Sequence, residues 1–322
     1  MRDKLEQHQV WIYLAAIVSG LLTGRTMPEA TATWELALWP VLGVLLYATF
    51  TQVPLVHVSG AFRDRRFLVS LLAGNFLLMP CVVWLLLTIV PDDRAIKLGV
   101  LLVLLVPCTD WFISFTHLGR GDATRAIAAT PVLLVMQILL LPFYLWLFID
   151  EDTTDMAIAS HLLPAFIGLI LLPLSLAWIT EKLAEKQKPL NTLIAGLGWC
   201  PVPLLAMVVF LIAASQVGLV LESGRLLWSV VLAFALYLLA AATVGKLLAC
   251  VAGLPAPAGR TLVFSLGTRN SFVVLPLAIS LPDAWSAAVV VIVLQSLVEL
   301  FGMIAFLKWV PTRLIRSGPD PG

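Results

Sequence analysis

Long apolar runs recur from one end of this 322-residue chain to the other, and they constrain its fold more than any other feature. A helix that crosses a bilayer needs roughly 17–25 mostly apolar residues, and many runs in the chain reach that length. The composition agrees, because 61% of the residues are hydrophobic and only 12% are charged, whereas soluble domains are about a quarter charged. The sequence therefore predicts an all-α polytopic membrane protein.

The apolar runs divide into ten candidate transmembrane helices joined by short connections. No soluble domain is expected, so residues 1–322 form a single integral membrane unit. The candidate helices, which we call spans 1 to 10, cover residues 10–26, 34–56, 67–90, 95–118, 124–149, 158–180, 191–217, 226–250, 258–281 and 285–310.

Basic residues in the connections predict the orientation, because cytoplasmic loops are rich in Lys and Arg. With both termini in the cytoplasm, fifteen basic residues lie on the cytoplasmic side and four on the other side. The cytoplasmic set is Arg2, Lys4, Arg63, Arg65, Arg66, Arg120, Arg125, Lys182, Lys186, Lys188, Lys246, Arg260, Lys308, Arg313 and Arg316. The opposite set is Arg25, Arg94, Lys97 and Arg225. We expect a multi-pass protein of the inner (plasma) membrane with cytoplasmic termini.

The second half of the chain resembles the first at an offset of about 160 residues. The matches are Trp39-Pro40 with Trp199-Cys200-Pro201, Asp122 with Asp283, and Gln137 with Gln295. Each half would hold five spans, which is an odd number, so the second copy must be inserted upside down. The sequence thus predicts two inverted repeats, at about residues 8–150 and 157–312. Inverted repeats are typical of secondary transporters, whose substrate sites lie near the membrane midplane.

Spans 4 and 9 are both interrupted at their centres, at residues 107–110 and 267–271. Pro107 removes a backbone donor, Gly267 permits unusual dihedrals, and Thr268 supplies a local polar partner. A broken helix frees N–H and C=O groups that lipid cannot satisfy. Paired breaks in corresponding positions of two halves therefore predict a substrate site where the two helices cross. The alternative is a pair of kinks in a purely structural bundle.

Asp110 and Arg269 are the deepest charges in the two broken spans, and they are opposite in sign. A charge at the membrane centre is costly unless it is paired, so we expect the two to pair, either structurally or in competition with substrate or a proton. Glu299 in span 10 either carries a proton or hydrogen-bonds within the bundle. The side chains expected to contact substrate are Cys108, Thr109, Arg269, Asn270 and Ser271.

Several classes of function are not expected. No two His or Cys residues have metal-ligand spacing, and no P-loop or basic nucleic-acid signature is present, so we predict no metal, no cofactor and no nucleic-acid partner. The partners expected are a small-molecule or oxyanion substrate, protons and the lipid bilayer. A transporter is favoured over an enzyme, and a non-transporting sensor or scaffold is the alternative class. Nothing in the sequence indicates the oligomeric state.

The two broken spans and their polar residues resemble those of the bile acid:sodium symporter superfamily, and within it most closely those of the arsenite-efflux permeases. The resemblance covers nearly the whole chain and implies a panel domain from spans 1, 2, 6 and 7 and a core domain from spans 3–5 and 8–10. Its most specific motif is Pro107-Cys108 followed by Gly121-Asp122, because arsenite permeases carry a functional cysteine in span 4 at that distance from a Gly-Asp pair. The resemblance implies that Cys108 binds As(III), which prefers sulfur ligands; a small buried side chain is the alternative.

The sodium ligands of that superfamily are replaced in this chain. Sodium-coupled members carry Ser-Asn in span 4, where this chain has Phe112-Ile113, and Glu and Gln in span 9, where it has Ser265 and Arg269. Apolar groups and a fixed cation cannot coordinate Na⁺, so we expect no sodium dependence at those sites. The retained polar positions are Thr116 and Thr130.

The coupling acid of the arsenite permeases is also replaced, because their span-9 Glu would fall near Phe272. Proton coupling would then pass to Asp110 or Glu299. The resemblance accordingly implies a secondary transporter that exports arsenite or antimonite by proton antiport, and we expect Asp110 to be released and recaptured by Arg269. The alternative is a sodium-independent transporter of a small organic anion, whose carboxylate would pair with the Arg269 guanidinium.

Overall fold

Helices make up the fold of this protein. The structure is a computed structural model that describes residues 2–53, 64–109, 111–148, 162–185, 187–216 and 224–316. In these ranges there is no strand, and one isolated antiparallel bridge joins Pro107 to Arg269. The helices are α1 (Arg2–Thr26), η1 (Pro28–Ala30), α2 (Thr31–Phe50), α3 (Arg65–Ala73), η3 (Gly74–Leu78), α4 (Met79–Leu86), α5 (Arg94–Leu104), α6 (Trp111–Leu118), α7 (Ala123–Phe148), η5 (Phe166–Leu171), α9 (Leu172–Ala184), α10 (Lys188–Leu197), α11 (Pro201–Ser215), α13 (Gly224–Val251), α14 (Ala256–Gly267), α15 (Ser271–Ile279), η6 (Asp283–Trp285), α16 (Ser286–Trp309) and η7 (Val310–Leu314). The predicted all-α class is confirmed for the described residues.

Several of these helices can cross a membrane, so the protein is a multi-pass membrane protein. Five are long and apolar enough by themselves, and the pair α10–α11, bent by 44°, would make a sixth. The five cover Arg65–Leu86, Ala123–Phe148, Leu162–Ala184, Trp228–Val251 and Asp283–Leu314. The predicted total of ten is not confirmed by this measure, partly because spans 4 and 9 each consist of two short helices.

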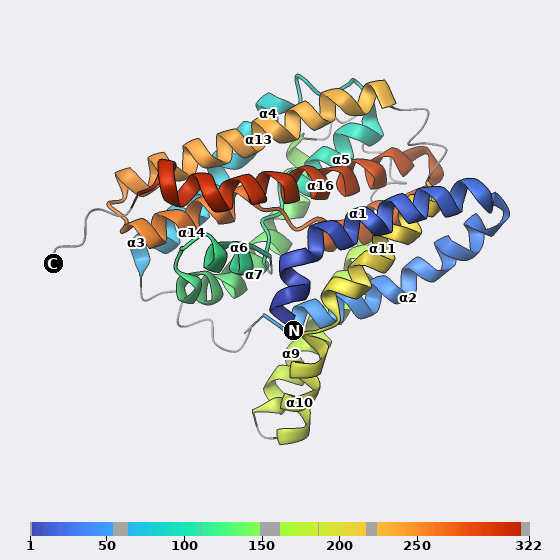
Figure 1. Ribbon diagram of the computed structural model, residues 1–322, viewed down its shortest axis with the longest axis horizontal. Coiled ribbons are helices and arrows are strands. Elements are labelled where there is room, and N and C mark those ends of the chain that lie inside the picture. The colour runs from blue at the N-terminus through green and yellow to red at the C-terminus, as the bar shows by residue number, and fades with distance from the viewer. Residues whose placement is uncertain are drawn as a thin grey trace.

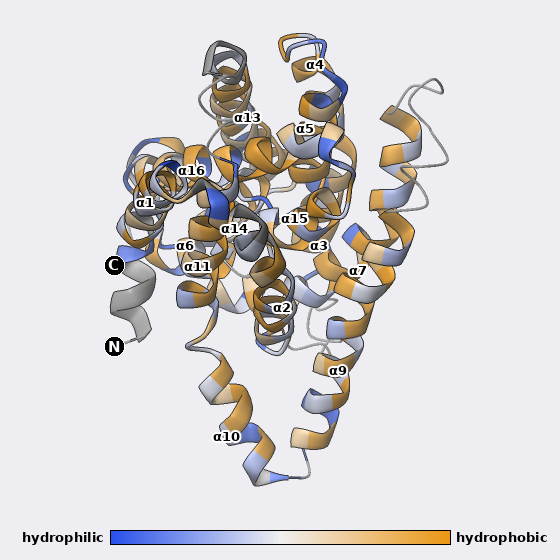
Figure 2. Ribbon diagram, turned by 90° about the vertical axis from the view of Figure 1, so that its right-hand side faces the viewer, coloured by the Kyte–Doolittle hydropathy of each residue, from blue (hydrophilic) through white to orange (hydrophobic). Residues whose placement is uncertain are grey.

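The outward faces of the bundle are apolar, as membrane helices require. Figure 2 shows hydrophobic residues on the faces of most helices rather than along one inner stripe. Several large hydrophobic side chains are mostly exposed, among them Trp146 at 71% and Trp228 at 75%. In water such exposure would be unfavourable, whereas in a bilayer it places these side chains against lipid.

The helices pack in two groups, which Figure 1 separates clearly. One group contains α1, α2, α9, α10 and α11, and α9 and α10 project from the body of the molecule. The other contains α3 to α7 and α13 to α16, in which α16 lies against both α5 and α13. The groups meet where α1 and α11 contact α16 and where α2 contacts α15. We call this contact zone the seam.

Two glycines hold α1 tightly against α11. They belong to the segment GLLTG, whose GxxxG spacing is typical of close helix packing. A Cβ added to Gly20 would lie 2.5 Å from the carbonyl oxygen of Phe210, and one added to Gly24 would lie 2.2 Å from that of Ala214. Any side chain at either position would therefore push the two helices apart.

Span 3 contains a π-helical turn, η3, between α3 and α4. Asn75 lies in this turn and is fully buried. The hydroxyl of Tyr144 on α7 donates a hydrogen bond to the carbonyl oxygen of Phe76, a backbone group in the wider turn. Such turns occur frequently at functional sites, and this one directs the Asn75 amide toward the break in span 9.

Candidate functional site

The two helix breaks lie against each other and satisfy each other's backbone groups. The backbone N–H of Cys108 donates to the carbonyl oxygen of Thr268 at 3.1 Å, and that of Asn270 donates to Val106 at 2.8 Å. The Asn270 amide also donates to the Thr109 hydroxyl at 3.1 Å. All five residues are buried. The short antiparallel pairing between α5–α6 and α14–α15 thus supplies the partners that lipid cannot.

The Arg269 side chain is buried at the crossing, with only 2% of its surface exposed. Asp110, its predicted partner, lies outside the described residues, so that ion pair remains a prediction. Among the described residues, the guanidinium donates to four neutral oxygens. They are the carbonyl oxygens of Leu104 (3.3 Å), Ser265 (3.2 Å) and Leu266 (2.7 Å) and the side-chain oxygen of Asn75 (2.8 Å).

Three of those oxygens belong to the C-terminal ends of the half-helices α5 and α14. A helix C-terminus carries the negative end of the helix dipole and leaves carbonyl groups without intrahelical partners. The guanidinium satisfies these groups, and its central carbon lies 5.2 Å from the centre of the Tyr237 ring. A single cation therefore stabilises the ends of both broken helices.

A hydrogen-bonded row of side chains runs from Ser271 to Glu299. The Ser271 hydroxyl donates to Gln295 Oε1 at 2.8 Å, and Gln295 Nε2 donates to Glu299 Oε2 at 2.7 Å. The backbone N–H of Arg269 donates to the same carboxylate oxygen at 2.8 Å. The four residues are buried, each 2–3% exposed. We call Ser271, Gln295 and Glu299 the relay.

One end of the relay reaches a cavity on the seam. The cavity lies between α1 and α11 on one side and α6, α15 and α16 on the other, and Ser271 is in its wall. The rings of Tyr13, Trp111 and Phe272 form an aromatic corner, with Tyr13 stacked on Trp111 at 5.8 Å between ring centres. Aliphatic side chains and the hydroxyl-bearing Ser296 complete the lining. The volume is about 20 Å³, which is room for about one water molecule.

A second cavity lies further along the same seam. It has a volume of about 130 Å³ and lies between α2, α11, α15 and the start of α16. Its wall is more polar, with Ser215, Gln216, Asp283 and Ser286 among the lining residues. The two cavities share α11, α15 and α16, so they mark successive levels of one interface between the helix groups.

The remaining predicted site residues line neither of the two cavities described above. Cys108 is 1% exposed. Thr130 is buried and its hydroxyl donates to the carbonyl oxygen of Ala126 at 2.9 Å, a contact within its own helix. Thr116 is buried near the end of α6. Pro107 and Gly267 lie where the two spans break, as expected from their backbone chemistry.

The Gly121-Asp122 pair forms the junction between α6 and α7. The Gly121 N–H donates to the carbonyl oxygen of Thr116 at 2.7 Å, and Arg120 takes the left-handed conformation, with φ of 57°. This geometry closes a helix C-terminus. The Asp122 carboxylate accepts the backbone N–H of Arg125 at 3.0 Å, which caps the start of α7. In this chain the motif ends one helix and begins the next.

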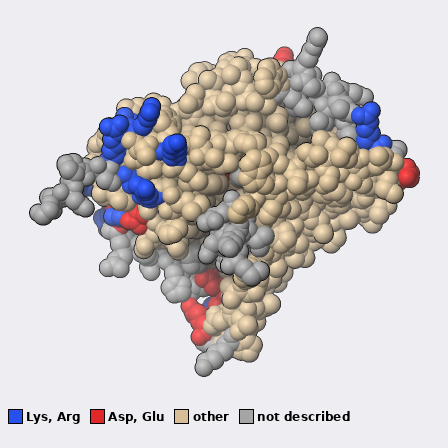
Figure 3. Space-filling view, in the orientation of Figure 1, with Lys and Arg blue, Asp and Glu red and all other residues tan. Residues whose placement is uncertain are grey.

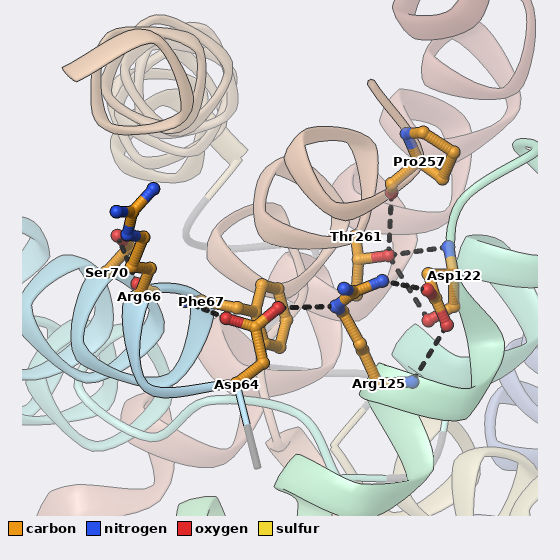
Figure 4. Close-up of polar contacts among 8 residues, drawn as sticks. All are labelled: Asp64, Arg66, Phe67, Ser70, Asp122, Arg125, Pro257 and Thr261. Atoms are coloured by element: carbon orange, nitrogen blue, oxygen red, sulfur yellow. Dashed lines mark hydrogen bonds and ion pairs between the residues drawn. The ribbon is translucent and has the colours of Figure 1, made fainter. Parts of the chain in front are cut away.

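A second charged site joins the ends of three spans, and Figure 4 shows its members converging. Arg125 on α7 contacts Asp122 and donates to Asp64 at 2.9 Å. The Thr261 hydroxyl on α14 accepts the Asp122 backbone N–H at 2.8 Å. We call Asp64, Asp122, Arg125 and Thr261 the Arg125 cluster. Hydrogen bonding from the Phe67 backbone N–H, and then from Arg125, lowers the pKa of the Asp64 carboxyl.

Sequence reasoning did not find Asn75, Tyr237 or the Arg125 cluster. One signal was available for Asn75, because it is the lone amide in the apolar run of span 3. Gln295 was noticed only as a match between the two halves, and its position between Ser271 and Glu299 depends on how α15 packs on α16. The cluster joins residues 61 and 139 positions apart, so no local pattern could reveal it.

Comparison with known proteins gives one family match. The model of the Sodium Bile acid symporter family matches residues 39–223, which is more than half of the chain. The matched range contains the break between α5 and α6, and the break between α14 and α15 lies beyond it. No curated protein matches the chain.

Proposed function

The chain belongs to the sodium bile acid symporter family, and from this premise we propose that it is a sodium-independent secondary transporter of a small organic anion. At the coarser level it is a membrane transporter of this superfamily.

The proposed architecture has ten spans in two inverted repeats, at about residues 8–150 and 157–312. The group α1, α2, α9, α10 and α11 would act as the panel domain and the other group as the core domain. The antiparallel pairing of the two breaks supports this proposal, because two inverted copies would cross in that way. Alternating access would then consist of movement between panel and core along the seam.

The substrate proposal rests on the first cavity of the seam, the one of about 20 Å³ with Ser271 in its wall. Trp111 and Ser271, which are the first residues of α6 and α15, both line it. Helix N-termini attract anions, and the aromatic and aliphatic wall suits a hydrocarbon or ring. The substrate that fits both features is a small carboxylate with an apolar body. The cavity is too narrow for it in this conformation, so the panel must move away from the core to admit it.

Sodium independence is supported at the two positions that depart from the sodium-coupled members. Phe112 is fully buried and apolar. The guanidinium of Arg269 donates hydrogen bonds to carbonyl oxygens at the C-terminal ends of two half-helices. Transporters with broken helices hold their coupling cations at such ends. A fixed cation there repels Na⁺. Coupling would instead pass to protons through Glu299, with Asp110 as the second candidate acid.

Arsenite or antimonite, exported by proton antiport, is the second candidate substrate. The position of Cys108 directly beside the crossing favours it, because As(III) prefers thiol ligands. In the described part of the chain, however, no group of three or more His, Cys, Asp or Glu side chains is arranged to hold a metal ion. One buried thiol is a poor cage for As(III), and the cavity wall therefore favours the organic anion.

The proposed orientation places both termini in the cytoplasm of a cell with this protein in its inner membrane. Figure 3 shows that Lys and Arg gather at the end of the molecule where α16 finishes and α14 begins. Cytoplasmic ends of membrane proteins carry such an excess. The panel and core would thus open alternately to this basic end and to the opposite end.

Flux into proteoliposomes tests the proposal. Labelled benzoate, phenylacetate, hexanoate and arsenite would be offered under separate sodium and proton gradients. We expect saturable carboxylate uptake that a sodium gradient does not stimulate. Ser271→Ala should lower this uptake about 2- to 10-fold, whereas Ser296→Ala, which removes the other cavity hydroxyl, should not. Arsenite flux that disappears in Cys108→Ser, without carboxylate flux, would establish the second candidate instead, and sodium stimulation would contradict both.

A further inference from the structure

The relay connects the cavity to a buried acid through one amide. Ser271 is in the cavity wall, Glu299 lies at the far end, and Gln295 is hydrogen-bonded to both at 2.8 and 2.7 Å. Gln295 and Glu299 lie four residues apart on α16, so they share a helix face. No other residue intervenes between the hydroxyl and the carboxylate.

The direction of these hydrogen bonds restricts what the cavity can accept. A serine hydroxyl has one hydrogen, and Ser271 gives it to Gln295 Oε1. A carboxylate substrate offers acceptors only. It can therefore hydrogen-bond to Ser271 only if the hydroxyl hydrogen turns from Gln295 toward the cavity, which leaves Gln295 Oε1 without its donor.

A half-turn of the Gln295 amide repairs this loss. Its Nε2 group then donates to the Ser271 oxygen, and Oε1 faces Glu299 in place of Nε2. Two oxygens would then face each other, and they form a hydrogen bond only if the Glu299 carboxyl carries a proton. Each of the two arrangements pairs every polar atom in the row from Ser271 Oγ to Glu299 Oε2, and a mixed arrangement leaves one of these atoms unsatisfied.

We propose that binding of the anion at Ser271 causes Glu299 to take up a proton, with Gln295 as the residue that couples the two events. The inference rests on the proposed function, since it takes the substrate to be a carboxylate. The proton comes from water on the side to which the cavity is open. One negative charge and one proton enter together, so the core domain moves without a net change in charge, which a bilayer favours.

The surroundings of Glu299 leave this acid as the titrating member of the relay. Its carboxylate faces the backbone N–H of Arg269, which remains in place in both arrangements. The Arg269 guanidinium lies in the break between α14 and α15. The other titratable groups on described elements packed against α16 are His8, Tyr13 and Arg25 on α1, Arg94 and Lys97 on α5, His117 on α6, Tyr237, Lys246 and Cys250 on α13, Arg260 on α14, Asp283 in η6 and Arg313 in η7. The described helices α11 and α15 contain no titratable side chain. Asp110 lies outside the described residues.

Proton uptake measured on anion binding tests the inference without transport. The full-length protein in weakly buffered detergent would receive benzoate, phenylacetate or hexanoate, with a pH indicator reporting protons and equilibrium dialysis reporting bound anion. We expect about one proton per bound anion for the wild type. Gln295→Met keeps the side-chain volume but has no amide, so it should still bind the anion within about tenfold of the wild-type affinity and take up almost no protons.

Gln137→Met is the matched control. Gln137 is also a buried glutamine, on α7, and its amide has no hydrogen-bond partner among the described residues. This variant should retain wild-type proton uptake per bound anion. Glu299→Gln should bind the anion with an affinity that no longer depends on pH.

The outcomes separate the inference from the proposed function. Anion binding without proton uptake in the wild type, or unchanged uptake in Gln295→Met, would overturn the inference and leave an organic-anion transporter standing. If none of the three carboxylates binds to the wild type, the proposed function fails and the inference fails with it. If Gln295→Met does not fold, Gln295→Leu and Ser271→Ala replace it, because each interrupts the relay at one residue and must likewise abolish proton uptake.

Discussion

The helix crossing and the Arg125 cluster each contain an arginine, but they use its charge differently. At the crossing, the Arg269 guanidinium donates to neutral oxygens of the described residues and is 2% exposed. In the cluster, Arg125 pairs directly with two carboxylates, and its side chain is 33% exposed. Water reaches the cluster and can hydrate the ionised groups, whereas the crossing must satisfy a cation with the dipoles of broken helices. Depth in the bundle thus determines how each arginine is neutralised: by carbonyl and amide oxygens at the crossing, and by carboxylates and water in the cluster.

Arg269→Leu should give the largest effect. The carbonyl oxygen of Leu266 would keep one donor, the Tyr237 hydroxyl at 3.2 Å. The carbonyl oxygens of Leu104 and Ser265 and the side-chain oxygen of Asn75 would lose the guanidinium donor in a buried site. Each such group costs about 1–3 kcal/mol, so the free energy of unfolding should fall by at least about 3 kcal/mol. The measurement is unfolding of the purified protein in mixed micelles by titration with sodium dodecyl sulfate. Arg269→Lys, which keeps the charge but not the fork of donors, should lose less.

Arg125→Leu should give a smaller effect. The cluster lies at the end of the bundle, its side chains are partly exposed, and water can take the place of the guanidinium. Partly exposed ion pairs contribute about 1 kcal/mol or less, so the same titration should show a loss of that size. A loss equal to that of Arg269→Leu would remove the distinction between the two sites.

Acidification should give the smallest effect, and of the two arginine sites only the cluster should respond to it. The Asp64 carboxyl has a lowered pKa in the folded protein, so its contribution is complete above the ordinary value of 3.8 and is lost as the pH falls below it. Because the group is partly exposed, the contribution is about 0.5 kcal/mol. Comparing acid unfolding of the wild type with that of Asp64→Asn isolates the contribution of Asp64. As the pH falls below 3.8, the free energy of unfolding of the variant should decrease less than that of the wild type, by about 0.5 kcal/mol. An identical dependence in both proteins would mean that Asp64 is not held by Phe67 and Arg125.

The positions of the two breaks could be predicted because they depend on local chemistry. Pro107 and Gly267 interrupt their spans wherever the rest of the chain goes, and lipid then requires the freed backbone groups to find partners. The meeting of the breaks followed from their matching places in the two halves. The structure adds the individual partners: the backbone N–H of Cys108 donates to Thr268, and that of Asn270 donates to Val106.

The hydrogen-bond partners of the site could not be predicted in the same way. Arg269 contacts Asn75 across 194 residues and Leu104 across 165 residues, so these contacts depend on how spans 3, 4 and 9 pack. The sequence predicted an ion pair between Asp110 and Arg269 because both are charged. Which backbone carbonyl oxygens lie near the guanidinium depends on helix packing and cannot be read from the sequence. Likewise Gly121-Asp122 suggested a family motif, whereas its hydrogen bonds show the end of one helix and the start of another.

The π-helical turn in span 3 has a consequence for insertions and deletions. A π turn accommodates one residue more than the regular helix around it. Deleting one residue between 74 and 78 would allow the span to rewind as a continuous α-helix. The helices on both sides of the deletion would keep their faces, because the π turn absorbs the extra residue without rotating them. Only the side chains of the turn itself would move, and the Asn75 amide would leave Arg269. The extra residue in this span therefore serves the contact with Arg269 and is not needed for the packing of the flanking helices.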